Sequence, residues 1–401
     1  NNYIGGHTAT MDVEYGHQRY AVDTGFIVFN DWTYPNFIAL LNELGVEWQY
    51  SDMSFSLRCE RTGLEYNGTS INSLFAQRLN ALRPSFLRMI HDILRFNDHA
   101  KQSLPTLDEN ITLSDFLKQG NYSAAFVERY IVPMGRSIWS ASESAMLNFP
   151  ARFFVDFFER HGFLNVDNRP RWRAIKGGSR EYMKKLSKPF ESQIYLNSAV
   201  IGVERNAHDV RVRTKHGDVH TFDYVVFACH SDQALRMLQK PSAEEQHILG
   251  AFPYQENEVL LHTDMRMLPR KPLARAAWNY HLLKNNQDRV ALTYDMNVLQ
   301  NLNAPMKFLV TLNRSDDIDP AKVMGRYTYD HPVYTPQAVA AQKQHSMLNG
   351  QQRSFYCGAY WRSGFHEDGV VSALNMLKDF ARCIADDSSN RSGPQRMERA
   401  T

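Results

Sequence analysis

Residues 354–369 read SFYCGAYWRSGFHEDG, and this stretch decides the fold. Its first four residues form an apolar run typical of a short buried strand, which Gly358 closes. Apolar residues then recur at helical spacing through residues 371–381, which predicts a helix that starts near Gly369. Backbone N–H groups at a helix N-terminus favour negative charge. Glu367 and Asp368 stand just before the predicted helix, and capping of that helix is the simplest interpretation.

A second glycine-containing segment lies at the start, where residues 1–8 read NNYIGGHT and residues 20–26 read YAVDTGF. Residues 8–14 and 19–23 alternate between apolar and polar around Tyr15 and Gly16, which predicts a hairpin. A tight turn follows at Asp23, Thr24 and Gly25. Glycine lets the main chain approach a flat ring or a phosphate because no Cβ stands in the way. An ordinary turn glycine is the alternative interpretation.

The two ends of the chain together resemble the FAD-dependent amine oxidase superfamily, which also holds the phytoene desaturases and protoporphyrinogen oxidases. More narrowly, the chain is similar to bacterial proteins described as predicted NAD/FAD-binding or flavin-containing amine oxidase-like proteins. The matching phrases are AVDTGFIVFNDWTYP (21–35), KGGSREY (176–182), FACHSD (227–232) and GFHEDG (364–369). The resemblance implies a mixed α/β fold, in which a Rossmann-like FAD/NAD(P)-binding domain carries an inserted substrate domain.

The resemblance also implies boundaries and a cofactor site. The FAD-binding domain is expected to be discontinuous, over residues 1–66, 177–253 and 325–385, with the substrate-binding domain at 67–176 and 254–324. Residues 386–401 are rich in Ser, Asn and Arg, and we expect them to be a disordered tail. The residues expected to contact FAD are Gly5, Gly6, His7, Thr24, Gly25, Phe26, Val200, Gly358, Phe365, His366, Glu367 and Asp368.

The middle of the chain carries the expected substrate side. Residues 70–160 show a helical pattern, and strands are predicted at 259–263, 276–281, 291–294 and 307–312. Polar side chains among aromatic strands indicate a cavity with a few hydrogen-bonding groups, although any single residue is more often structural. The candidate substrate residues are Tyr254, Asn257, Trp278, Tyr280 and Tyr294. A phenylalanine-rich helical face at residues 149–158 is either a further lining or plain helix core.

Composition narrows the classes of function. With 45 basic and 43 acidic residues, the formal net charge of +2 argues against a nucleic-acid binder. No apolar run approaches the roughly 20 residues of a membrane span, so we expect no transmembrane segment, and peripheral membrane contact stays open. The four cysteines lie far apart and are typical of reduced thiols in a cytoplasmic protein. His216 and His220 fall in a predicted hairpin, so no metal site is expected.

The Gly-x-Gly-x-x-Gly fingerprint that binds a dinucleotide pyrophosphate does not occur in these 401 residues. In relatives it precedes the glycine pair that matches Gly5 and Gly6, and we therefore expect the chain to lack about 30 residues of the dinucleotide fold. A non-catalytic remnant, acting as a binding or structural protein, is one alternative. An enzyme with a separate NAD(P) site is less favoured because that site would need its own fingerprint.

The favoured function is an FAD-dependent oxidoreductase that acts on a C–N or C–C bond of a small amine or lipid-like substrate. A flavin carries the redox chemistry itself, so the absence of a strong protein nucleophile does not argue against catalysis. The lysine and the aromatic pair of many amine oxidases cannot be assigned here, and the catalytic residues stay unidentified. A desaturase acting on a fatty-acyl or isoprenoid substrate is therefore the alternative to an amine oxidase. Substrate, electron acceptor and oligomeric state are not predicted.

Overall fold

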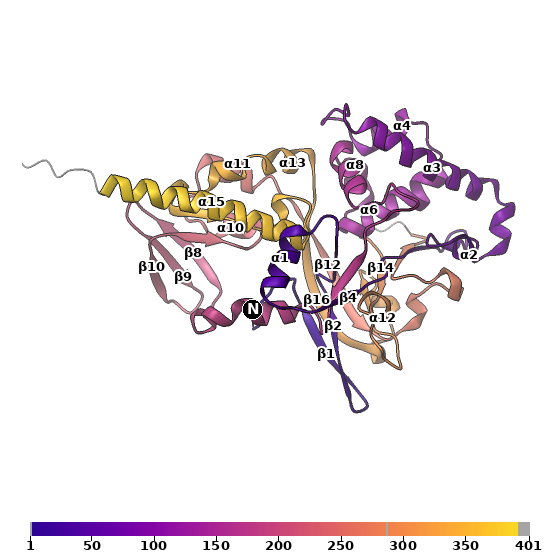
Figure 1. The fold of residues 1–401 in the computed structure, drawn as a ribbon, viewed down its shortest axis with the longest axis horizontal. Helices are drawn as coiled ribbons and strands as arrows, with labels where there is room; N and C mark the ends of the chain where they lie inside the picture. The colour runs from indigo at the N-terminus through magenta and orange to yellow at the C-terminus, as the bar shows by residue number, and fades with distance from the viewer. Residues whose placement is uncertain (1, 286–287, 392–401) are drawn as a thin grey trace, which may run out of the picture. The chain divides into compact units, whose positions relative to one another are not determined.

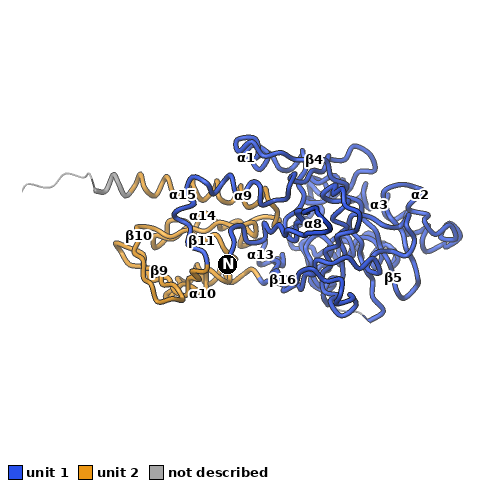
Figure 2. Tube along the Cα trace, turned by 90° about the horizontal axis from the view of Figure 1, so that it is seen from below, with its two compact units in different colours: residues 1–196, 253–339 blue, residues 197–252, 340–401 orange. Residues whose placement is uncertain are grey.

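The structure of the chain is a computed structural model that describes residues 2–285 and 288–391. Contacts divide the chain into two compact units (Figure 2). Unit 1 holds Asn1–Leu196 and Pro253–Val339, and unit 2 holds Asn197–Phe252 and Ala340–Thr401. The expected FAD-binding segments therefore fall in both units. Because this division rests on contacts and not on ligands, the functional domain boundaries stay a prediction.

A seven-stranded sheet is the centre of unit 1, in the order β16-β12-β15-β14-β13-β5-β6. All neighbouring pairs are antiparallel except β13 and β5, which are parallel. The four strands predicted between residues 259 and 312 are all present. β5, β6 and β16 join this sheet although they lie in segments expected for the FAD-binding domain. The bounds are β5 (Phe55–Cys59), β6 (Glu65–Asn67), β12 (Tyr254–His262), β13 (Trp278–Leu282), β14 (Leu292–Asp295), β15 (Leu309–Leu312) and β16 (Val323–Pro332).

The two faces of this sheet differ in chemistry, because successive side chains of a strand point to opposite faces. The register places a set of mostly aromatic residues on one face, which we call the aromatic face: Asn257, Trp278, Tyr280, Tyr294, Tyr327 and Tyr329. The opposite face, which we call the polar face, carries Arg58, His262, His281, Thr293 and Thr311.

The predicted helical region forms a group of short helices around one long helix, α3 (Figure 1). The bounds are α2 (Ile71–Leu74), η1 (Arg78–Leu82), α3 (Pro84–Ser103), α4 (Leu113–Gln119), α5 (Ala124–Phe126), η2 (Val127–Ile131), α6 (Val132–Trp139), α7 (Glu143–Leu147) and α8 (Ala151–Arg160). Phe154 and Phe158 of α8 are buried and stacked, and Phe157 contacts Trp139. These phenylalanines form helix core.

The remaining parts of unit 1 flank the sheet. The predicted hairpin at residues 10–23 is present, and β3 and β4 pair on either side of β7. The bounds of these elements are β1 (Thr10–Tyr15), β2 (Gln18–Asp23), β3 (Val28–Asn30), α1 (Pro35–Glu43), β4 (Trp48–Tyr50), β7 (Trp172–Ile175), α9 (Arg180–Ser187), η3 (Lys188–Gln193), η4 (Met265–Met267), η5 (Pro272–Ala274), α12 (Met296–Leu299), η6 (Ser315–Asp317) and η7 (Pro320–Lys322). α13 (Pro336–Gln342) crosses the boundary between the units.

Unit 2 combines a β-meander with a parallel strand pair. β10, β9 and β8 form the meander, and β11 pairs in parallel with β17. A buried ion pair between Arg205 and Glu245, joined by the Tyr356 hydroxyl at 2.6 Å, ties β8, α11 and β17 together. The bounds are β8 (Val200–Arg205), β9 (Val210–Thr214), β10 (Val219–Phe222), β11 (Val225–Phe227), α10 (Ser231–Met237), α11 (Ala243–Leu249), α14 (His345–Leu348), η8 (Gln351–Arg353), β17 (Ser354–Tyr356), η9 (Ala359–Trp361) and α15 (His366–Arg391).

Helix α15 begins three residues before the predicted start. The Phe365 N–H donates to the Asp368 carboxylate at 3.0 Å, so Asp368 caps the helix from inside its first turn. The helix continues to Arg391, and residues 392–401 of the expected disordered tail lie outside the described residues. No helix within residues 2–285 and 288–391 is long and apolar enough to cross a membrane.

Candidate functional site

The glycine pair near the start forms a closed turn in unit 1. The Thr8 N–H donates to the Gly5 carbonyl at 2.9 Å, and the φ angles of Gly5 and Gly6 are +118° and +56°. A Cβ at Gly5 would lie 2.6 Å from the Thr8 carbonyl oxygen, so only glycine fits there. A Cβ at Gly6 would meet nothing within 4 Å. The main chain at Gly6 is therefore open to a ligand.

This turn is fixed to the end of strand β2. The Phe26 N–H donates to the His7 carbonyl at 3.0 Å, and the Thr24 N–H donates to the Ala9 carbonyl at 2.9 Å. A Cβ at Gly25 would lie 1.9 Å from the His7 carbonyl oxygen. The two predicted glycine segments therefore touch each other, and the side of Gly25 that a side chain would occupy faces protein backbone.

The buried carboxylate of Asp23 organises the same turn. It accepts hydrogen bonds from the Thr10 hydroxyl at 2.5 Å, the Ser179 N–H at 2.9 Å and the Gln300 side-chain amide at 3.0 Å. Burial raises the pKa of Asp23 to about 6, against the lowering effect of the Thr10 and Ser179 hydrogen bonds. Asp23 thus joins β1, β2, the start of α9 and the end of α12.

His7 places the turn against the aromatic face. Its ring centroid lies 4.9 Å from that of Tyr329 and 5.9 Å from that of His331, both on β16. The hydroxyls of Tyr329 and Thr24 share a hydrogen bond of 2.8 Å. Burial raises the pKa of Tyr329 to about 12, so its hydroxyl keeps its proton at neutral pH. Tyr329 and His331 were not among the predicted site residues. The alternation of Tyr327, Tyr329 and His331 indicates a strand with these three side chains on one face.

The five candidate substrate residues all lie on the seven-stranded sheet but do not form one cluster. Asn257 is fully buried and lies beside the His7 group, because its side-chain nitrogen is 3.4 Å from Nδ1 of His331. Trp278 and Tyr294 are register partners whose rings meet edge to face at 5.1 Å. Tyr280 shares β13 with Trp278, three strands from β12. Tyr254 has the opposite parity to Asn257 on β12, so it points away from the aromatic face.

In unit 2, the predicted cofactor residues gather at the start of α15, apart from Val200, which begins β8. The Gly358 N–H donates to the Ser372 hydroxyl at 2.9 Å. Glu367 and Asp368 are buried, and burial raises the pKa of Asp368 to about 6. Burial also lowers the pKa of His366 to about 3, so this imidazole is neutral.

A buried donor in unit 2 supports a ligand near α15. The indole N–H of Trp361 is buried and has no hydrogen-bond partner among the described residues. A buried donor without an acceptor costs free energy, and a ligand oxygen or nitrogen would satisfy it. Within unit 1, the open main chain at Gly6 fits a flat ring such as that of a flavin. Within unit 2, the Trp361 indole offers a donor to a ligand acceptor. No group of three or more potential metal ligands occurs among the residues the structure covers.

Comparisons with known proteins identify the family and the fold of the chain. A family model for flavin containing amine oxidoreductases matches residues 1–270. Cyclohexylamine oxidase from Brevibacterium oxydans IH-35A is similar in structure, with a TM-score of 0.65 and 13% identity over 95% of this chain and 93% of that chain. A CLA-producing fatty acid isomerase from P. acnes gives a TM-score of 0.63 and 13% identity, over 92% of this chain and 89% of that one.

A third solved structure, reduced UDP-galactopyranose mutase, gives a TM-score of 0.64 and 15% identity over 95% of this chain and 89% of that chain. At such identities the likeness shows the fold alone, and the mixed α/β amine oxidase fold is confirmed. No curated protein sequence matches the chain. The family match covers well over half of the 401 residues, and the chain therefore belongs to the flavin containing amine oxidoreductase family.

Proposed function

We propose that this chain is an FAD-dependent oxidoreductase that oxidises a C–N or C–C bond of a small amine or a lipid-like molecule. The observation that carries the proposal is the open main chain at Gly6, held beside the aromatic face by the contact of His7 with Tyr329. Glycine at this point admits a flat ring, and the aromatic face supplies an apolar surface beside it. Membership of a family that binds FAD supports the same cofactor.

The residues that would hold FAD come from both glycine segments. In unit 1 they are Gly5, Gly6, His7, Thr24, Gly25 and Phe26. In unit 2 they are Val200, Gly358, Phe365, His366, Glu367 and Asp368, and the Trp361 indole would donate to an acceptor on the bound group. When bound, FAD accepts the two electrons that the substrate loses.

The side chains near Gly6 would hold and orient a substrate, and none of them would act as a nucleophile. Tyr329 is buried and keeps the proton on its hydroxyl, which Thr24 holds in place. The side chain of Asn257 is fixed on both sides, since its oxygen accepts from the Asn313 amide at 2.9 Å and its nitrogen lies beside His331. These groups would orient a substrate by hydrogen bonds, while the aromatic residues around them exclude water.

FAD binding is tested by filling the open space at Gly6. We expect Gly6→Leu to weaken FAD binding at least about tenfold, a loss of about 1.4 kcal/mol, because its side chain would occupy the ligand's place. Gly16→Leu is the matched control: Gly16 has a similar φ of +63°, and a Cβ there also meets nothing within 4 Å. The backbone cost of about 1–2 kcal/mol is therefore shared by both variants.

The measurement is the visible absorption spectrum of the purified protein after FAD is added and the excess removed. Flavin bands in the natural chain and in Gly16→Leu, but not in Gly6→Leu, would support the proposal. Equal flavin retention in both variants would remove Gly6 from the site. No flavin in any of the three proteins would contradict the function and favour a non-catalytic binding or structural protein.

Substrate class is then read from anaerobic bleaching of the bound flavin. Primary amines and unsaturated fatty acids are the two arms of the screen. Bleaching by amines alone would assign an amine oxidase, and bleaching by fatty acids alone would assign a desaturase-type enzyme. The few polar groups on the aromatic face, Asn257 with His331 beside it, support a substrate with a mostly apolar body.

A further inference from the structure

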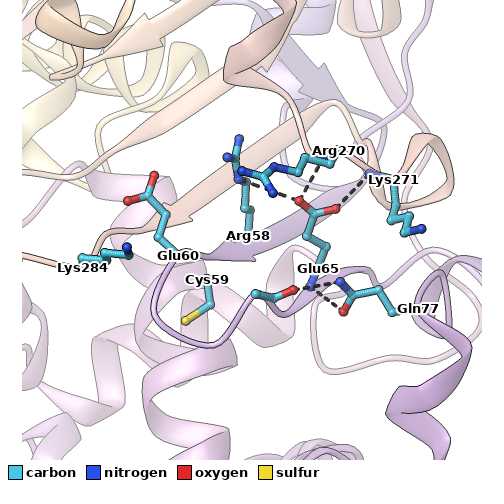
Figure 3. A pocket seen from close by; sticks show the side chains of 9 residues that line it. Arg58, Cys59, Glu60, Glu65, Gln77, Arg270, Lys271 and Lys284 are labelled. Carbon is cyan, nitrogen blue, oxygen red and sulfur yellow. Dashed lines mark hydrogen bonds and ion pairs between the residues drawn. The ribbon is translucent and has the colours of Figure 1, made fainter.

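A cavity lies at the β5–β6 end of the seven-stranded sheet (Figure 3). Its volume is about 510 Å³, within the range of roughly 300–1,000 Å³ that small-molecule sites occupy. Strands β5 and β6, the hairpin between them and the segment after η4 form its walls, all within unit 1. Four cationic side chains and two carboxylates line it: Arg58, Arg270, Lys271, Lys284, Glu60 and Glu65.

Both carboxylates are already engaged by the protein. Glu65 is buried, and its two oxygens accept the backbone N–H groups of Arg270 at 3.0 Å and Lys271 at 2.9 Å. Its carboxylate also lies 3.7 Å from Nε of Arg58. Glu60 accepts a hydrogen bond from the Arg314 guanidinium at 3.2 Å. Glu65 thus positions the backbone of two basic residues, and the four cations outnumber the two carboxylates in the cavity wall.

Three of the cations have no counter-charge. The side chains of Arg270, Lys271 and Lys284 are exposed and make no hydrogen bond or ion pair within residues 2–285 and 288–391. Figure 3 shows them on the same cavity as Arg58 and Glu65. Cations that surround one concave surface raise its potential, because low-dielectric walls focus the field. An anion bound there would be attracted by all of them together.

We propose that this cavity binds a small organic anion that carries at least two negative charges, in the form of phosphate or carboxylate groups. The Arg270 guanidinium can bind a phosphate or a carboxylate group with two parallel N–H donors. Lys271 and Lys284 each add a positive charge near the bound anion. The hydrogen bonds from the backbone of Arg270 and Lys271 to the buried Glu65 hold these two adjacent basic residues at the cavity, although their charges repel each other.

This site is separate from the glycine turn of unit 1 that is proposed for FAD. The His7 group meets the sheet at β16, whereas the cavity is built on β5 and β6. Five strand spacings separate β16 from β5, which is roughly 24 Å at about 4.8 Å per spacing. An anion in the cavity is therefore distinct from a ligand bound beside His7, and the inference does not rest on the proposed function.

The experiment is calorimetric titration of the protein with inorganic pyrophosphate and, separately, with citrate. FAD is present in every sample, so that any flavin site is occupied. The test variant is Arg270→Gln with Lys271→Gln, whose side chains are exposed. The control is Lys118→Gln with Lys378→Gln, which removes the same charge from exposed side chains outside the cavity.

We expect saturable binding to the natural chain and to the control, and about tenfold weaker binding to the test variant, since each exposed charge contact contributes up to about 1 kcal/mol. Tighter binding of pyrophosphate would assign a phosphate-bearing ligand, and tighter binding of citrate a polycarboxylate. Equal binding to both variants would overturn the proposal, as would the absence of saturable binding by either probe. Circular dichroism and the thermal midpoint without ligand report that the variants are folded.

Discussion

Asp23 shows how one buried side chain fixes the turn beside the proposed flavin. Its carboxylate accepts hydrogen bonds from Thr10, Ser179 and Gln300, and the Asp23 N–H donates to the Gln300 side chain at 2.8 Å. Replacement by alanine would leave the Ser179 N–H buried without an acceptor, and the Gln300 amide with only its 3.4 Å hydrogen bond to the Ala21 carbonyl. A buried donor left without an acceptor costs about 1–3 kcal/mol, so replacing Asp23 should lower the stability of the protein around this turn.

We predict that Asp23→Ala lowers the free energy of unfolding by about 2–4 kcal/mol. Asp316→Ala is the control, because Asp316 is exposed and has no partner among the described residues, and its effect should stay within about 0.5 kcal/mol. Urea unfolding at neutral pH measures both. Similar losses in the two variants would show that the Asp23 network contributes little to stability.

Sequence analysis located the Asp23 turn but not its partners. The turn residues are adjacent in sequence, and Gly25 indicates a turn because glycine is common in tight turns. Ser179 and Gln300 lie 156 and 277 positions away, so no local pattern connects them to Asp23. The same limit applies to His7 and Tyr329, whose rings lie 4.9 Å apart although the two residues come from opposite ends of the chain.

Four neighbouring strands of the sheet are joined by a hydrogen-bonded chain on the polar face. Nε2 of His262 lies 2.7 Å from the Thr311 hydroxyl, which lies 2.8 Å from the Thr293 hydroxyl. Thr293 in turn lies 3.1 Å from Nε2 of His281. All four side chains are buried, so each depends on its neighbour for a partner. Thr293 is the link that completes the chain between β13 and β15.

We predict that Thr293→Val destabilises the protein by about 1–3 kcal/mol, because it keeps the shape of the side chain but removes both hydrogen bonds. Thr328→Val on β16 is the matched control: Thr328 is exposed on the same sheet, makes no side-chain hydrogen bond among the described residues, and should change stability by less than about 0.5 kcal/mol. Thermal unfolding compares the two. A larger loss in the control than in Thr293→Val would contradict the role of the chain.

Regular elements with clear periodicity were predicted well, and their pairing was not. The hairpin of β1 and β2 and the strands β12, β13, β14 and β15 follow local patterns of period two, and the helices of residues 70–160 follow a period of 3.6. The alternation of Tyr327, Tyr329 and His331 in β16 does not reveal that β12 is its neighbour in the sheet. The start of α15 was placed late because Asp368 caps the helix from within its first turn, a bond that the order of residues does not show.

At the scale of the whole molecule, each compact unit is assembled from two separate stretches of chain. Among the described residues, four buried histidines have lowered pKa values and two buried aspartates have raised ones. Burial lowers the pKa of His345, one of the four. Burial lowers the pKa of His262 to about 4 and of His366 to about 3, and it lowers that of His281 well below its usual range. Burial raises the pKa values of Asp23 and Asp368 to about 6. The two sets act on stability in opposite directions.

A buried histidine has a lower pKa in the folded protein than in the unfolded chain, where the pKa is about 6.5. As the pH falls below about 6.5, the unfolded chain binds more protons than the folded protein, and the folded protein becomes less stable. Between pH 6.5 and 5 this costs up to about 2 kcal/mol for each histidine, at about 1.4 kcal/mol per pH unit. An aspartate whose folded pKa is raised acts the other way, since its stabilising effect is present at low pH and is lost as pH rises through about 6. Each aspartate regains at most about 1.4 kcal/mol between pH 6 and 5. The histidines therefore dominate.

We predict a lower thermal midpoint at pH 5 than at pH 7. Asp368→Asn should steepen this acid sensitivity, because it removes one of the two opposing groups while its side-chain oxygen can still accept the Phe365 N–H. Asp316→Asn, on the exposed side chain, should leave the difference between the two pH values unchanged. Scanning calorimetry measures the thermal midpoint of the three proteins at pH 5 and at pH 7. A midpoint that is equal or higher at pH 5 in the natural chain would mean that the histidines are charged in the folded state, and that burial does not control their protonation.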